Sequence, residues 1–168
     1  GLWRKKVLNP ESNVQFGEGG AGTFSDGKLY SQIKDPRFLG RKVMTEFVKA
    51  GAPADILYEA HPHIGTFKLV KVVENMRAQI IALGGEIRFG QRVTDVALEA
   101  CAPGAQRRSR QLKALTVLDV PSGTAYDLPT RHAVLALGHS ARDTFAMLYR
   151  RDVAMDAKPF SIGFRIEH

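Results

Sequence analysis

The sequence contains one cysteine, Cys101, among its 168 residues, so no disulfide can form within the chain. Cys101 has no partner for C-x-x-C redox chemistry, which favours an inert thiol and a reducing compartment. No run of eighteen apolar residues is present, and the first residues, GLWRKK, lack the apolar core and cleavage site of a signal peptide. We therefore expect a soluble, cytoplasmic protein that does not enter a membrane.

Side chains for metal binding or hydrolysis are also sparse. His61 and His63 form an HPH run, but no third cluster of metal ligands stands near them in sequence, so no metal site is predicted. His139, Ser140 and Asp143 supply the residue types of a catalytic triad. They crowd into one turn, however, and a G-x-S-x-G nucleophile elbow is absent. A hydrolase is therefore disfavoured, and the catalytic residues stay unknown.

The formal net charge is +7, which suits nucleic acid, an anionic cofactor or solubility alone. The basic residues form small groups at residues 4–6, 107–110 and 150–151, and none is interleaved with the aromatic side chains on which bases stack. Solvated loops and helix ends explain these groups best. Nucleic-acid binding, which would weaken steeply with salt, is the least favoured of three functions considered.

The first half of the chain contains two helical patterns. Residues 40–49 (GRKVMTEFVK) predict a helix that a glycine and a proline stop. Residues 66–83 predict a longer helix, with Thr66 as its N-cap and with Gly84 and Gly85 ending it. Its apolar positions recur at spacings of three and four: Leu69, Val72, Val73, Met76, Ile80 and Leu83.

After this helix the apolar period falls to two, with Ile87 and Phe89 alternating against polar residues. Residues 93–98 and 112–120 predict two strands of an antiparallel hairpin or meander, joined by an exposed loop. Pro121, Ser122 and Gly123 predict a further turn. A helix followed by strands is typical of an α/β protein.

The last third begins with a short apolar run, HAVLAL at residues 132–137, which predicts a strand buried on both faces. Gly138 bounds it. Residues 142–151 predict a helix with Ser140 near its start, and residues 153–166 predict extended chain. Ligands in α/β folds bind where strands end and helices begin, but an ordinary turn with Ser140 as N-cap is the favoured alternative.

A glycine-rich loop covers residues 13–28 (NVQFGEGGAGTFSDGK). Gly17, Gly19 and Gly22 match G-x-G-x-x-G, the dinucleotide-binding pattern. That pattern should follow a buried strand and open a long apolar helix, and neither flank is present, so the standard Rossmann interpretation is rejected.

The same loop can still present backbone N–H groups to an anion. Thr23 and Ser25 would add hydroxyl donors, and Lys28 would add positive charge. A cofactor contact and a purely structural turn are equally compatible with the sequence, and Asp26 with Lys28 forms either a surface pair or part of that contact.

Four long strings resemble a family of bacterial FAD-dependent dehydrogenases of the glutathione-reductase-like flavoprotein class. They are NPESNVQFGEGGAGTFSDGKLYSQ (9–32), HIGTFKLV (63–70), VLALGHSARDTF (134–145) and KPFSIGFRIEH (158–168). The resemblance implies an FAD-dependent oxidoreductase of unknown substrate, with NAD(P)H as a candidate electron donor in the full-length protein.

The resemblance also implies which residues contact the cofactor. The loop would lie against the flavin and pyrophosphate, Val93 would offer its backbone to the adenine, and residues 136–140 would form the family's alanine-threonine-glycine motif. Leu137 replaces the threonine of that motif, so its hydroxyl is lacking. The implied cofactor-binding residues are Gly17, Glu18, Gly19, Gly20, Gly22, Thr23, Ser25, Asp26, Lys28, Val93, Ala136, Gly138, His139 and Ser140.

The expected fold is thus α/β, a partial FAD/NAD(P)-binding (Rossmann-like) domain with an antiparallel β-meander, incomplete at both ends. Residues 1–151 would be the central part of an FAD-binding domain without its N-terminal βαβ unit, and residues 152–168 would begin a second, substrate-facing domain. We expect such a fragment to be inactive alone, to bind FAD poorly and to self-associate through exposed sheet edges. The other function left open is a nucleotide- or anion-binding module without turnover.

Overall fold

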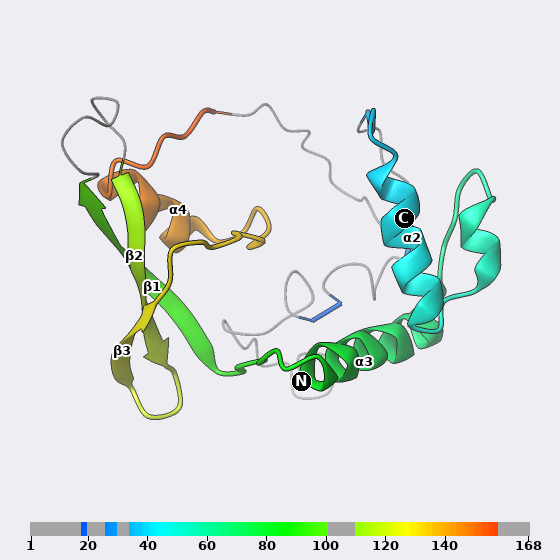
Figure 1. The fold of residues 1–168 in the computed structure, drawn as a ribbon, viewed down its shortest axis with the longest axis horizontal. Coiled ribbons are helices and arrows are strands. Elements are labelled where there is room, and N and C mark those ends of the chain that lie inside the picture. Colours follow the sequence, from blue (N-terminus) through cyan, green and yellow to red (C-terminus); the bar gives the residue numbers. More distant parts are fainter. Residues whose placement is uncertain (1–17, 20–25, 30–33, 101–109, 158–168) are drawn as a thin grey trace, which may run out of the picture. The chain divides into compact units, whose positions relative to one another are not determined.

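The structure is a computed structural model that describes residues 18–19, 26–29, 34–100 and 110–157 (Figure 1). The chain divides into two compact units, Gly1–Phe89 and Gly90–His168, and each is described by itself. Helices and an antiparallel sheet are both present, so the mixed α/β class expected from the sequence is confirmed. The domain boundary expected at residues 151–152 stays a prediction.

The first unit contains helix α2 (Leu39–Lys49), a short 3-10 helix η2 (Ala54–Leu57) and helix α3 (Thr66–Ala82). The helix predicted at residues 40–49 is confirmed as α2. Glu46 pairs with Lys42 and Lys49 along one face, at N–O distances of 2.5 and 3.0 Å. The Asp35 carboxylate accepts the N–H of Gly40, which satisfies a donor in the first turn.

Helix α3 confirms the longer predicted helix but corrects its start. Its N-cap is Gly65 rather than Thr66, and Thr66 is the first helical residue. At the other end, Gly84 has φ of 86°, and the N–H groups of Gly84 and Gly85 donate to the carbonyls of Ile81 and Ile80. These two bonds form a Schellman motif, which explains why a Gly-Gly pair ends the helix.

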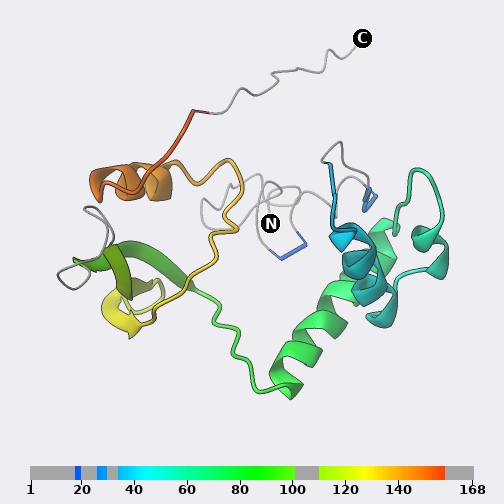
Figure 2. The same cartoon turned by 45° about the horizontal axis from the view of Figure 1, so that its top comes forward.

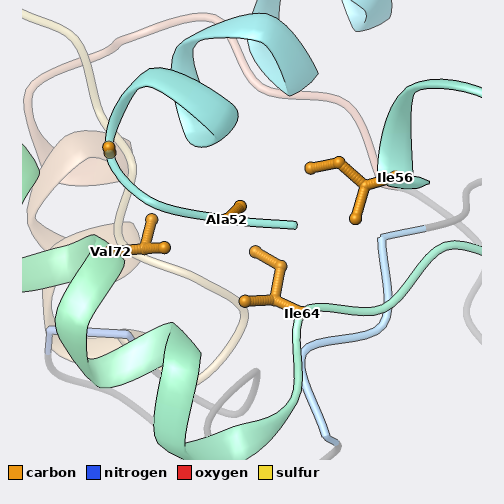
Figure 3. Close-up of a cluster of buried hydrophobic side chains, with 5 residues drawn as sticks. Ala52, Ile56, Ile64 and Val72 are labelled. Carbon is orange, nitrogen blue, oxygen red and sulfur yellow. The ribbon is translucent and has the colours of Figure 1, made fainter. Parts of the chain in front are cut away.

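The core of the first unit is small and apolar. Its buried residues come from the α2–η2 connection, the chain before α3 and α3 itself: Ala50, Ala52, Ile56, Ile64 and Val72 (Figure 3). Leu69 and Met76 pack against this cluster, as their spacing predicts. Ile80 and Leu83 continue the same stripe but are 44% and 80% exposed, so only the first part of α3 contacts this core.

The second unit is a three-stranded antiparallel sheet with one helix. Strands β1 (Gln91–Ala100), β2 (Arg110–Asp119) and β3 (Thr124–Pro129) follow one another in the order β1-β2-β3, which confirms the predicted meander. The third strand was not predicted. Helix α4 (Arg142–Arg150) confirms the helix expected at residues 142–151.

Helix α4 lies over one face of the sheet (Figure 2) and packs against it through a second apolar cluster. Met147 and Leu148 of α4 and Val96 of β1 are its buried members, and Leu98 and Leu115 pack around them. The sheet and α4 therefore form one packed body in this unit.

Two predicted strands are wrong. Residues 85–88 form neither helix nor strand, so the alternation of Ile87 and Phe89 does not build a strand. Residues 132–137 also lack strand structure, and Val134 and Leu135 are 93% and 51% exposed. A strand requires a neighbour for its N–H and C=O groups, and none of the strands found in the described residues pairs with either run.

Within the described parts of the chain, none of the helices combines the length and the apolar character needed to span a bilayer.

Candidate functional site

The structure describes only part of the predicted cofactor loop. Glu18, Gly19, Asp26 and Lys28 are described, and the remaining predicted loop residues lie outside the described residues: Gly17, Gly20, Gly22, Thr23 and Ser25. Asp26 and Gly27 have φ of 62° and 65°, values that a right-handed helix does not contain. A helix that continues through Asp26 and Gly27 is therefore excluded, which agrees with rejecting the standard Rossmann pattern.

Backbone hydrogen bonds join the end of the loop to the segment that precedes α3. Lys28 forms an isolated antiparallel bridge with His63, and the N–H of Leu29 donates to the carbonyl of Pro62 at 2.9 Å. The N–H of Ile64 donates to the carbonyl of Gly27 at 3.1 Å. A Cβ added to Gly27 would lie 3.2 Å from that of Ile64, so this close approach also favours glycine.

The side chain of Asp26 caps helix α3. Its Oδ1 accepts the N–H of Thr66 at 3.1 Å, and its backbone carbonyl accepts the N–H of Gly65 at 3.0 Å. Its Oδ2 lies 3.9 Å from Nε2 of His63, which forms an ion pair with it only when the imidazole is protonated, and among the described residues no ion pair joins Asp26 to Lys28. A carboxylate at a helix N-terminus is stabilised by the free N–H groups and the helix dipole. Sequence reasoning treated Asp26 as a surface or cofactor group and missed this cap.

Asp26, Lys28, His61 and His63 line an open surface groove of about 330 Å³. The Lys28 ammonium and the two imidazoles can donate hydrogen bonds to an anionic or polar ligand. Asp26 supplies the carboxylate, but its charge is directed at α3. In the parts of the chain that are described, no three His, Cys, Asp or Glu residues gather closely enough to hold a metal ion.

The beginning of the loop contacts α3 at a second place. Glu18 Oε1 lies 3.5 Å from Nε of Arg77, and the Arg77 guanidinium carbon lies 5.6 Å from the centre of the Phe89 ring. That distance is within the range of a cation–π contact. Arg77 was not singled out in the sequence, and its separation from Glu18 along the chain leaves no local signal.

The predicted residues of the strand-to-helix segment lie in irregular chain of the second unit. Ala136 is exposed and Gly138 has φ of 70°. Ser140 Oγ lies 3.4 Å from Nε2 of His139, so these two side chains are brought together. The N-cap of α4 is Ala141, without a side-chain bond, so the prediction that Ser140 caps this helix is wrong.

Val93 lies in β1 opposite Val117, beside an irregularity of register between Val93 and Asp95. It belongs to the same unit as Ala136, Gly138, His139 and Ser140, whereas the described loop residues belong to the other unit. The described residues of the predicted site thus form two groups, one in each unit, and each group is described by itself.

A further polar groove of about 370 Å³ lies in the second unit, between β1, the start of β2 and the end of α4. Arg151 donates through Nε to Asp95 Oδ1 at 2.7 Å, and its Nη2 bonds Oδ2 of the same carboxylate. These bonds lower the pKa of Asp95 to about 2. Arg110 donates to the carbonyl of Asp152 at 2.5 Å. Neither contact was predicted, because the partners are far apart in sequence.

No protein-family model matches the sequence. The chain is 46% identical over 167 residues to an uncharacterized protein of Clostridium beijerinckii. The match covers 99% of this chain but only 28% of that protein. The chain thus corresponds to less than a third of a longer polypeptide in this relative.

Proposed function

We propose that this chain is a segment of an FAD-dependent oxidoreductase. The observation that carries the proposal is the resemblance of four long strings, at residues 9–32, 63–70, 134–145 and 158–168, to bacterial FAD-dependent dehydrogenases. Uninterrupted strings are more specific than a lone glycine pattern, which is weak evidence by itself. When bound, the flavin would accept and pass on hydride or electrons, and the protein would supply position and electrostatics.

The observed elements are compatible with the proposed fold. An antiparallel three-stranded meander and helices are present, as the expected partial FAD/NAD(P)-binding domain requires. The Rossmann-like arrangement itself is part of the proposal, together with the location of a true dinucleotide fingerprint and its ribose-binding acid elsewhere in the longer protein. The substrate-facing domain beginning near residue 152 is proposed on the same basis.

The geometry at Asp26 limits where the pyrophosphate can bind. The N-terminus of α3 already has a carboxylate on the N–H of Thr66, so a second anion there would meet like charge. We therefore assign the pyrophosphate to another helix N-terminus of the full-length protein. At the groove itself, the exposed Lys28, whose backbone is fixed by the bridge to His63, would attract an anionic cofactor, whereas the Asp26 carboxylate would repel it.

In this proposal the described residues bind and orient the cofactor and do not react with it. Gly19, with φ of 79°, and Lys28, with its positive charge, belong to the loop that would contact the cofactor. On the same resemblance, Val93 would offer its backbone to the adenine, and Ala136, Gly138, His139 and Ser140 would contact the cofactor. No described residue is assigned to catalysis, and the flavin carries the reaction.

The test is flavin binding by the full-length protein that contains this sequence. The purified protein should show flavin absorption, release FAD on denaturation as identified by mass spectrometry, and bleach reversibly on reduction. The same FAD titration of the 168-residue chain should give weaker binding, because the proposed fingerprint helix is missing. A Lys28→Gln variant of the full-length protein should bind FAD more weakly, and Lys34→Gln, outside the groove, serves as its control.

Absence of FAD, both as purified and after titration, would reject the oxidoreductase proposal. Binding of FAD or of a nucleotide without any reduction would instead favour the binding module without turnover. Binding of nucleic acid that falls steeply with salt would favour the remaining alternative.

A further inference from the structure

The polar groove of the second unit brings together basic residues from two separate parts of the sequence. Arg110 begins β2, Arg150 ends α4 and Arg151 follows that helix, and all three line the groove. Two carboxylate residues, Asp95 and Asp152, also line it, so its lining has three positive residues and two negative ones. The groove therefore has an excess of positive charge, which comes from residues far apart in the chain.

Asp95 opposes a bound anion only weakly, because Arg151 compensates its charge. Nε and Nη2 of Arg151 donate to the two carboxylate oxygens, and the N–H of Val96 donates to Oδ1. These bonds lower the pKa of Asp95 to about 2, so the carboxylate is ionised and paired at neutral pH. The charges that a ligand would meet are those of Arg110, Arg150 and Asp152.

Arg110 and Arg150 both keep hydrogen-bond donors for a ligand. A guanidinium carries several N–H donors, and Arg110 uses its Nη2 on the carbonyl of Asp152. In the described parts of the chain, no hydrogen bond or ion pair engages the Arg150 guanidinium. The charge of Arg150 also contributes to the low pKa of Asp95, which indicates that Arg150 lies near this carboxylate.

The negative end of the α4 dipole would disfavour an anion if its carbonyls were open to the groove. They are bonded within the chain instead. The N–H of Asp152 donates to the carbonyl of Tyr149, and the N–H of Val153 donates to that of Leu148. These bonds form a second Schellman motif, with Asp152 at φ of 53° in the place that glycine usually takes. The carbonyl of Asp152 in turn accepts the bond from Arg110.

These donors fit a phosphate group better than a carboxylate. A carboxylate has two oxygens, and one guanidinium can bond both, as Arg151 does with Asp95 in this groove. A phosphate monoester has three acceptor oxygens and a charge of about −1.5 to −2 at pH 7, so it can accept bonds from two guanidinium groups. The groove volume of about 370 Å³ lies at the small end of the range for small-molecule sites.

We propose that this groove binds the phosphate group of a small phosphorylated molecule, held by Arg110 and Arg150. The site lies within the second unit. It does not depend on the proposed FAD function, so the two proposals can fail separately. The phosphate could belong to a free metabolite or to a dinucleotide cofactor, and the experiment separates these two sources.

The experiment titrates the full-length protein with inorganic phosphate at constant ionic strength and follows binding by phosphorus NMR. The variants are Arg150→Gln, Arg150→Lys and Asp152→Asn. Arg142→Gln is the matched control, because it makes the same charge change on the same helix but lies outside the groove. Circular dichroism of each variant checks that the fold is retained.

Arg150→Gln should raise the phosphate dissociation constant about three- to ten-fold, because it removes a charge-assisted hydrogen bond. Arg150→Lys should lose less, since the charge remains and only the planar fork is gone. Asp152→Asn should lower the constant about two-fold, because a like charge leaves the groove and Asn tolerates the same positive φ. Arg142→Gln should leave the constant unchanged.

Addition of FAD to the phosphate-bound protein identifies the source of the ligand. Displacement of phosphate by FAD would assign the groove to a phosphate of the cofactor, and phosphate binding alongside FAD would assign it to a separate phosphorylated molecule. Either result supports a phosphate site.

No phosphate binding by the unsubstituted protein, or an unchanged affinity in Arg150→Gln, would overturn the proposal. An equal loss in Arg142→Gln would show attraction by the overall positive charge and would also overturn it. If the protein binds no FAD, the proposed function fails, whereas the phosphate titration still decides whether this site exists.

Discussion

Asp26 serves both the loop that contains it and a helix forty residues away. Its backbone has φ of 62°, a conformation in which Asp and Asn are enriched among residues with a side chain. Its carboxylate meanwhile satisfies one of the free N–H groups at the start of α3. The residue thus replaces the local N-cap that Gly65 cannot provide.

Replacing Asp26 should therefore destabilise the first unit. We expect Asp26→Ala to lower the free energy of unfolding by about 1 kcal/mol, as for loss of an N-cap. Asp26→Asn should lose less, because the amide oxygen still accepts the bond but the charge near the helix dipole is gone. Urea unfolding followed by circular dichroism measures both. Glu59→Gln, a carboxylate-to-amide change on an exposed residue of the same unit, should be neutral, and an equal loss there would contradict the capping role.

The Asp95–Arg151 pair connects β1 to the residue that follows α4. The hydrogen bonds from Arg151 are the main cause of the low pKa of Asp95, and the N–H of Val96 lowers it further. Both partners are partly exposed, at 32% and 51%, so we expect the pair to contribute no more than about 1 kcal/mol at neutral pH.

The pH dependence of this contribution has a definite sign. The pKa of Asp95 is about 2 in the folded protein and 3.8 for an unperturbed aspartate, so the folded state favours the ionised form. The stabilisation is complete above pH 3.8 and is lost as the pH falls toward 2. The difference in unfolding free energy between the unsubstituted protein and Asp95→Asn, from urea titrations, should shrink across that range. A difference that stays constant down to pH 2 would contradict this assignment.

Single residues were the hardest features to predict from the sequence. The Asp26–Thr66 and Asp95–Arg151 contacts join residues 40 and 56 positions apart, and nothing in the local pattern marks them. The sequence did indicate that Asp26 and Lys28 lie in a shaped loop, but it left open whether they form a surface pair or contact the cofactor. The fold instead brings His63 to both residues.

At the scale of elements, the helices were predicted well because their signals are local. Apolar spacing located α3, the helical character of residues 40–49 and 142–151 located α2 and α4, and the Gly84–Gly85 pair located the end of α3. A strand forms only beside a partner strand, which is not visible in the local sequence pattern, so the strands were predicted less accurately. The β1–β2 hairpin was found, β3 was missed, and the apolar runs at residues 87–89 and 132–137 were wrongly predicted as strands.

The Schellman motif at the end of α3 gives a prediction for its two glycines. Gly84 has φ of 86° with open space around a built Cβ, so Gly84→Ala should cost only the backbone strain, about 1 kcal/mol. A Cβ on Gly85 would lie 2.9 Å from the carbonyl oxygen of Ile80, so Gly85→Ala should cost more and fray the last turn. Thermal unfolding monitored by circular dichroism would rank the two variants. The reverse order would show that the positive φ at Gly84 costs more stability than the close approach of a Cβ at position 85 to Ile80.

At the scale of the whole molecule, the two apolar cores share no residue. Val72 belongs to the cluster of the first unit, and Met147 belongs to the cluster of the second. Val72→Ala and Met147→Ala should each cost about 2 kcal/mol or more, because both side chains are almost completely buried. Each substitution should accelerate amide exchange first in its own unit.

Hydrogen exchange with mass spectrometry would test this division. Tyr149→Ala is the control for Met147→Ala, because Tyr149 lies on the same helix but is 73% exposed and should lose little stability. Equal acceleration across both units in either core variant would contradict the division and would indicate a single cooperative unfolding step.

The remote cap of α3 also has a consequence for the order of folding. The Asp26–Thr66 contact closes a loop of forty residues, and loop-closure entropy makes such contacts slower to form than the local turns of a helix. Helix α3 and its Schellman end should therefore form before the cap. The kinetic φ-value of Asp26, the change in folding activation free energy divided by the change in unfolding free energy on substitution, should then be close to zero. Asp26 and the residues bridged to the segment before α3, 27–29, would then be among the last parts of the unit to become fixed during folding.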